Sequence, residues 1–187
     1  MANFNTYIDK IDVDFWRELC QREGKLRQYP KGAYFLRAGE TAKYLGFIET
    51  GFFNYSVVDS SGIEHITGFA LCNTLAGDFY SMIRREAALN SLKASVNSTA
   101  WVIDAGKVRQ CLDAHPEFRC YFAEELFRMA HERYINLYRK SSKERYIEIL
   151  NRCPDILQQI TLKEMASYLN ITPTHLSRIR KEMRLGK

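Results

Sequence analysis

The chain has 187 residues, of which 46% are hydrophobic and 13% aromatic, so it can bury a core and is not expected to be disordered. No window approaches the roughly 18 uninterrupted apolar residues of a membrane span. The start MANFNTYIDKIDVDF has acids where a secretory signal needs a basic segment, so we expect a cytoplasmic protein with no membrane partner.

The net charge of +5 is concentrated near one end of the chain. Residues 141–187 hold nine of the 27 lysines and arginines, Lys187 included, but only five of the 22 acids. A local basic surplus favours a polyanionic partner, because phosphate contacts release condensed counterions. Basic residues near helix ends are also common without any such partner, since they complement the helix dipole. Charge alone leaves both readings open.

The first predicted element is a helix that begins after Asp12 and ends near Gly24. Asp12 can cap the first turn by accepting a backbone N–H, and glycine is frequent where a helix ends. The apolar residues that share one side of this helix are Phe15, Trp16, Leu19 and Cys20.

Residues 30–103 alternate short apolar runs with turn signals, which is typical of an antiparallel β barrel or sandwich. The runs are AYFL, YLGFIE, FFNYSVV, IEHITGFA, KASVNS and AWVI. Glycines stand between them at positions 32, 39, 51, 62 and 77. Tight turns need a positive φ, which side chains with a Cβ disfavour, and this explains why glycine recurs there.

Helical texture returns with AGKVRQCLDAH, and Pro116 is well placed to open a long helix that continues to Lys140. This helix carries two apolar stripes. One repeats at coiled-coil spacing and consists of Ala123, Phe127, Ala130, Tyr134 and Leu137. The other consists of Phe118, Phe122, Leu126 and Met129. We infer that one stripe lies on the β region and the other meets a second copy of the chain, although one wide stripe covered within a single chain is the alternative.

Two capping boxes follow the long helix. SSKE pairs Ser141 with Glu144, and TLKE pairs Thr161 with Glu164, so each box predicts the start of a helix. The first box also predicts a hinge between the long helix and a C-terminal unit.

Residues 160–183, ITLKEMASYLNITPTHLSRIRKEM, predict a helix-turn-helix. Ala166 allows two helices to cross closely, and Asn170 tolerates a left-handed turn. Thr172 then caps the second helix, with Pro173 at its first position. The apolar residues spaced to fill the angle between the helices are Met165, Leu169, Ile171, Leu176 and Ile179.

The outward face of the second helix is polar and basic. Its predicted members are Thr174, Ser177, Arg178 and Lys181, with His175 at the flank. Such a set suits a helix laid in the major groove of double-stranded DNA, with Arg178 reading a base. We expect Thr161, Thr172 and Lys181 to position phosphates. A merely solvated polar face is the bland alternative.

Taken in order, these elements make the chain similar to the Crp/Fnr family of bacterial transcription regulators. The resemblance is carried by PKGAYFLRAGE, YLGFIETGFFNYSVVDSSGIEHITGF, LAGDFY and MASYLNITPTHLSRIRKEM. It implies an α+β fold: an antiparallel β roll (double-stranded β-helix) of the cyclic-nucleotide-binding type in residues 1–115, a dimerisation helix in 116–140 and a helix-turn-helix domain in 141–187. It also implies a homodimer that binds two DNA half-sites ~34 Å apart, with RNA polymerase as a further candidate partner.

The chain departs from this family where cyclic nucleotides bind. Members that bind them carry GDFFGEL and RSATV, whereas this chain has GDFYSMI and LKASV. Met82 replaces the glutamate that holds the ribose, and Leu92 replaces the arginine that pairs with the phosphate. We therefore expect no binding of cyclic AMP or GMP. We expect the effector pocket to persist, either with a different ligand or with no ligand. Its expected residues are Phe79, Tyr80, Met82, Lys93, Phe122 and Leu126.

The DNA-reading end also departs from the family. Where members often read SRETVSR, this chain has TPTHLSR, which keeps Arg178 but places Pro173 and Thr174 where arginine and glutamate read bases. The operator is therefore expected to differ from familiar ones. The sequence leaves open the effector, the operator, and whether the protein activates or represses.

Enzymatic and metal-binding functions are not supported by the sequence. The five cysteines form no C-x-x-C pair, and no Ser/His/Asp arrangement stands out, so we expect no metal, no cofactor and no enzyme. A cupin-like metalloenzyme would need a His-x-His cluster, and EHITGF offers one histidine. The remaining alternative is a small-molecule-binding β-roll module whose helical tail makes protein contacts without reading DNA.

Overall fold

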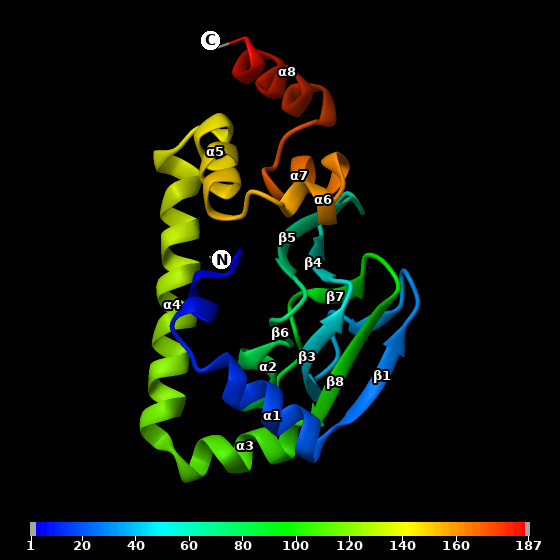
Figure 1. Cartoon of the computed structure of the whole chain (residues 1–187), viewed down its shortest axis with the longest axis vertical. Helices are drawn as coiled ribbons and strands as arrows, with labels where there is room; N and C mark the ends of the chain where they lie inside the picture. The colour runs from blue at the N-terminus through cyan, green and yellow to red at the C-terminus, as the bar shows by residue number, and fades with distance from the viewer. Residues whose placement is uncertain (1–2, 186–187) are drawn as a thin grey trace.

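The computed structural model describes residues 3–185, so Lys187 of the basic C-terminal surplus lies outside the described residues. Eight strands form two four-stranded antiparallel sheets, ordered β1-β8-β3-β6 and β2-β7-β4-β5, and we call these two sheets the β roll (Figure 1). The strands are β1 (Lys25–Tyr29), β2 (Tyr34–Leu36), β3 (Tyr44–Thr50), β4 (Phe53–Val58), β5 (Glu64–Ala70), β6 (Leu75–Ala76), β7 (Ser91–Ala94) and β8 (Ser98–Asp104).

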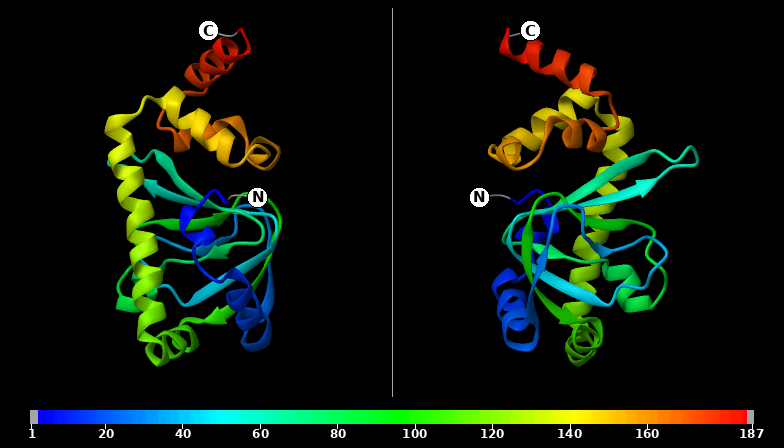
Figure 2. Two further views of the ribbon diagram at one scale, coloured as in Figure 1. Left: turned by 60° about the vertical axis from the view of Figure 1, so that its left-hand side comes forward. Right: turned by 90° about the vertical axis from the view of Figure 1, so that its right-hand side faces the viewer.

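Helices flank the β roll and form the C-terminal end. They are η1 (Thr6–Asp9), α1 (Val13–Glu23), α2 (Phe79–Arg84), α3 (Ala105–Ala114), α4 (Pro116–Arg139), α5 (Ser142–Arg152), α6 (Ile156–Gln159), α7 (Leu162–Tyr168) and α8 (Pro173–Arg184). Figure 2 shows α4 running along the height of the β roll, with the later helices gathered at its far end. Among the described helices, none is both long and apolar enough to cross a membrane.

Most predicted elements are confirmed. Asp12 caps α1 by accepting the Phe15 N–H at 2.9 Å. In both predicted capping boxes, the two reciprocal hydrogen bonds are present. The five turn glycines all have positive φ, between +74° and +158°. At Gly51 a Cβ would also lie 2.2 Å from the Ser98 Oγ, so the turn excludes larger residues by contact as well as by conformation.

Three strand assignments needed correction, and one of them is the short β6, which was not predicted. The run KASVNS was predicted as a strand, but β7 ends at Ala94 and residues 95–97 form a bend. The pairing of β7 with β4 ends at Ala94, opposite Phe53, because β4 itself begins there. Strand β1 was not predicted at all, since its sequence KLRQY is almost wholly exposed and carries no apolar alternation. It forms because it pairs along its whole length with β8.

The hydrophobic core consists of two clusters. The larger fills the β roll and continues under α1 and α4, where the Trp16 ring stacks on Phe118 with centroids 6.0 Å apart. The smaller cluster, which we call the C-terminal cluster, holds the last helices together, extends onto the roll through Phe52, Phe69 and Leu71, and includes Phe4 of the N-terminal segment. Each large apolar side chain fully buried in either cluster contributes about 1.5–3 kcal/mol.

The two stripes of α4 have different environments. Phe122 is 4% exposed, and Phe118, Leu126 and Met129 pack against the roll cluster, so this stripe is the inward one. The coiled-coil stripe faces solvent, and its Phe127 side chain is 71% exposed. Within one copy of the chain, α4 therefore keeps an uncovered apolar seam, made of Ala123, Phe127, Ala130, Tyr134 and Leu137.

Candidate nucleic-acid interface and ligand cavity

Helices α7 and α8 form a helix-turn-helix whose turn has the predicted chemistry. Asn170 has φ +56°, and the next N–H, that of Ile171, donates to the Ala166 carbonyl at 3.0 Å. Thr172 accepts the His175 N–H at 3.1 Å and caps α8, with Pro173 at its first position. These local hydrogen bonds fix the angle at which α8 leaves the turn.

The angle between α7 and α8 is filled as the sequence predicted. Met165, Ala166, Leu169 and Leu176 are fully buried, and Ile179 nearly so. A residue that the sequence reading missed supports them: Arg145 of α5 donates from Nη2 to the Leu169 carbonyl at 2.9 Å. No local pattern marks this contact, because it joins residues 24 positions apart.

The opposite face of α8 is exposed and polar. Thr174, His175, Ser177, Arg178 and Lys181 all lie on it, and among the described residues neither Arg178 nor Lys181 has an acidic partner. Figure 1 shows α8 as the outermost element at the C-terminal end, away from the β roll. Two unpaired cations on a protruding helix leave a positive surface open to an anionic partner.

Thr161 and Thr172 differ from the other candidate DNA-binding residues, because their hydroxyls already serve as helix caps. The Thr161 hydroxyl donates to the Glu164 carboxylate at 2.8 Å, and its backbone N–H donates to the same oxygen at 2.7 Å. A carboxylate in this position repels a phosphate. Lys163, a cation on the same helix, is exposed and was not among the predicted DNA-binding residues.

A cavity of about 430 Å³ lies between α2, α4, the β roll and the N-terminal segment. Five of the six predicted effector residues line it, namely Phe79, Tyr80, Met82, Phe122 and Leu126. The rings of Phe79 and Phe122 stack with centroids 4.7 Å apart. Their stacking ties α2 to α4 and gives the cavity an aromatic wall.

Lys93 does not belong to this cavity, so its prediction as an effector residue is wrong. Its neighbours Leu92 and Ala94 point into the roll, and Lys93 therefore points outward. Its ammonium donates to both carboxylate oxygens of Glu64, at 2.8 and 2.9 Å. This contact also lowers the pKa of the Glu64 carboxyl below its usual value.

The polar groups of the cavity are largely neutral. Burial raises the pKa of Tyr55 to about 12, and its hydroxyl donates to the Gly77 carbonyl at 2.9 Å. The pKa of Tyr7 is raised further by burial and by the neighbouring Tyr55. Among the described residues that line the cavity, only Asp78 and Arg133 are charged, and Asp78 already caps α2. The cavity therefore suits a mostly apolar ligand better than an anion.

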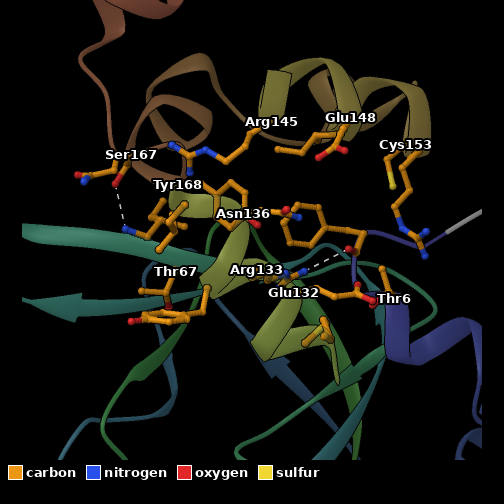
Figure 3. A pocket seen from close by; sticks show the side chains of 18 of the residues that line it. Thr6, Thr67, Glu132, Arg133, Asn136, Arg145, Glu148, Cys153, Ser167 and Tyr168 are labelled. Carbon is orange, nitrogen blue, oxygen red and sulfur yellow. Dashed lines mark hydrogen bonds between the residues drawn. The ribbon is translucent and has the colours of Figure 1, made fainter. Parts of the chain in front are cut away.

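A second cavity, of about 950 Å³, separates the β roll from the C-terminal helices. Figure 3 shows its lining from α4, α5, α7, β5 and the N-terminal segment. Where two walls of this cavity meet, the Ile66 N–H of β5 donates to the Ser167 Oγ of α7 at 2.9 Å. Sequence reading could not find this cavity, because its walls come from five separate stretches of chain.

No group of three or more metal-ligating side chains occurs within residues 3–185. Burial raises the pKa of the Cys20 thiol to about 12. A thiol of that kind packs as a small apolar group.

Comparison with known proteins gives a family match for the roll and structural matches for the whole chain. The model of the cyclic nucleotide-binding domain matches residues 26–115. No curated protein matches the sequence. FixK2 from Bradyrhizobium japonicum superposes with a TM-score of 0.72 at 16% identity, covering 87% of this chain and 85% of that chain.

Two further structures show the same fold over more of the chain. The c-di-GMP-responsive global regulator CLP from Xanthomonas campestris superposes with a TM-score of 0.66 at 13% identity, covering 94% of this chain and 93% of that chain. A protein from Eubacterium rectale described as a transcriptional regulator of the Crp/Fnr family gives 0.66 at 14% identity, with 95% and 86% covered. At these identities the likeness establishes the fold.

Proposed function

We propose that this protein is a dimeric, sequence-specific DNA-binding transcription regulator, because the model of the cyclic nucleotide-binding domain matches residues 26–115 and the fold is similar to that of solved transcription regulators. The observation that carries the proposal is the exposed polar face of α8, on a helix-turn-helix whose inward-facing apolar residues are buried. With a chromosomal target, the proposed location of the protein is the cytoplasm.

The chemistry of α8 suits the major groove. The planar guanidinium of Arg178 can donate two hydrogen bonds to the O6 and N7 of a guanine. Lys181 lies one turn further along and is a point charge suited to a phosphate. Thr174 and Ser177, which precede Arg178 on the same exposed face, add hydroxyls that can reach base edges or phosphate oxygens. Arg178 is thus the residue proposed to specify sequence, and Lys181 one that adds affinity.

The uncovered seam of α4 supports a homodimer. An apolar stripe at coiled-coil spacing is covered when a second copy packs its own stripe against it about a two-fold axis. Such a dimer presents two α8 helices to successive major grooves, ~34 Å apart on one face of DNA.

The 430 Å³ cavity is proposed to bind an effector other than a cyclic nucleotide. Met82 is 1% exposed and Leu92 is fully buried, so apolar side chains occupy the two positions where ribose and phosphate would need polar partners. Burying a phosphate beside them would leave its charge unpaired. A neutral, partly aromatic molecule fits the lining better.

The direct test compares two variants of α8 for DNA affinity by fluorescence anisotropy over a range of salt concentrations. Arg178→Ala is expected to cost about 1–3 kcal/mol on the selected site and to relax base preference at one position. Lys181→Ala is expected to weaken binding to all sequences alike and to reduce the salt slope by about one. Wild-type protein that shows no salt-sensitive DNA binding would favour the alternative of a ligand-binding module with a protein-binding tail.

A further inference from the structure

The first described residues, 3–9, contribute to both hydrophobic clusters. Tyr7 and Ile8 belong to the cluster of the β roll, whereas Phe4 belongs to the C-terminal cluster. Figure 1 shows this N-terminal segment between α4 and the β roll, below α5. One short stretch of chain therefore packs against both parts of the molecule.

Phe4 holds the helix-turn-helix against the roll. Its ring lies edge-on to Tyr168 of α7 and to Phe69 of β5, with centroid distances of 5.2 and 5.3 Å. On the same side, Arg152 of α5 pairs with Asp9 and donates to the Asn3 carbonyl. The segment thus links the C-terminal helices to β5 through both aromatic and ionic contacts.

The docked surface includes an edge strand. β5 ends its sheet, so its outward N–H groups have no neighbouring strand. Ser167 of α7 satisfies one of them by accepting the Ile66 N–H at 2.9 Å. This hydrogen bond exists only while α7 lies against β5, so the Ile66 amide reports on docking.

The same segment lines the 430 Å³ cavity. Asn5 and Tyr7 are part of its wall, and the Tyr7 ring lies 5.7 Å from the Phe122 ring of α4. Arg133 of α4 binds the segment by donating from Nη2 to the Asn5 Oδ1 at 2.9 Å and to the Phe4 carbonyl at 3.2 Å. Arg133 also lines both cavities.

From this arrangement we infer that residues 3–9 couple the effector cavity to the position of the helix-turn-helix. Tyr7 and Phe4 are three residues apart in one ordered stretch, so a ligand that displaces Tyr7 also disturbs the packing of Phe4 on Tyr168. Cavity occupancy then weakens the docking of α7 on β5. The role of this coupling in regulation rests on the proposed function, but the coupling itself is a property of the chain.

Hydrogen exchange of the full-length protein tests the coupling without DNA. Phe4→Ala removes the ring at the docked surface, and Leu126→Trp fills the cavity from α4. Both are expected to speed exchange of the Ile66 amide and of residues 165–170 by about tenfold or more, because local opening becomes easier. Tyr121→Trp introduces the same residue type at an exposed position of α4 and is expected to leave these amides unchanged.

The proposal is overturned if Leu126→Trp folds and leaves exchange at Ile66 and residues 165–170 at the wild-type rate. If Leu126→Trp does not fold, Tyr7→Leu replaces it, since removing the ring from the cavity wall should produce the same tenfold increase; unchanged exchange then overturns the proposal. DNA affinity is measured on the same samples. Coupled exchange without any DNA binding refutes the proposed function alone, whereas DNA binding without coupled exchange refutes only the coupling.

Discussion

The helix-turn-helix and the effector cavity are built in opposite ways. The turn is specified within about 25 consecutive residues, where caps, a left-handed asparagine and an apolar repeat all agree. The cavity is assembled from α1, α2, α4, the β roll and the N-terminal segment, which meet only in the folded chain. A substitution in the first region therefore acts on a local scaffold, whereas one in the second acts on a junction between elements.

The largest effect is expected in the scaffold. Leu176 is fully buried between α7 and α8, so Leu176→Ala should destabilise the C-terminal helices by about 2–5 kcal/mol through lost burial and a cavity. Chemical denaturation followed by circular dichroism measures the loss. Leu185→Ala, at a side chain 63% exposed, is the matched control and should shift stability by no more than about 0.5 kcal/mol. Equal effects of the two substitutions would contradict the scaffold.

A second effect is expected at the α4 seam. Its apolar repeat is visible in the sequence of one helix, but the surface proposed to cover it belongs to a second copy of the chain. Phe127→Asp places a charge at the centre of the proposed dimer contact and should weaken dimerisation by about 2 kcal/mol or more, roughly 30-fold in Kd. Sedimentation velocity at several concentrations measures this. Tyr121→Asp, on the same helix outside the seam, should leave the dimer intact. Unchanged association in Phe127→Asp would show that the seam is not the interface.

The cap of α8 should give a smaller effect. Thr172→Ala removes the acceptor of the His175 N–H and should cost about 1 kcal/mol. Thermal unfolding measures this cost, and Thr172→Ser should restore most of it because a serine hydroxyl can make the same bond. A loss that serine does not recover would assign Thr172 a role other than capping.

The smallest effect is expected at Lys93, where sequence and structure disagree. Because the ammonium pairs with the half-exposed Glu64 outside the cavity, Lys93→Ala should cost no more than about 1 kcal/mol of stability. The pair depresses the pKa of Glu64, so its contribution is present above the ordinary carboxyl pKa and is lost as pH falls through the lowered value. Denaturation at neutral and acid pH measures both. A larger loss, or one that grows at acid pH, would place Lys93 elsewhere.

The sequence predicted what local chemistry determines. Asn170, Thr172 and the turn glycines were found because each needs a residue type that few others can replace. Strand β1 was missed because its polar residues form a strand only by pairing with β8, 69 to 77 positions away. The placement of Lys93 failed for a related reason: which face a strand residue takes depends on register, and one position reverses it.

The contacts that the N-terminal segment makes with the cavities and the C-terminal helices could not be predicted from the sequence. The docking of Phe4 on Tyr168 joins the two ends of the chain, and no periodicity within either end indicates it. Arg133 likewise sits on a helix whose pattern shows only its apolar stripes. Such contacts depend on how complete elements pack, which a single sequence does not specify.

The central claim is that a dimer reads DNA through α8, and footprinting of the purified protein on genomic DNA tests it most directly. The account predicts protected sites made of two related half-sites ~34 Å apart, or 10–10.5 base pairs from centre to centre. It also predicts that Arg178→Ala relaxes the base preference at one position in each half-site. Absence of any protected site under low salt, or single sites without a second half, would contradict it.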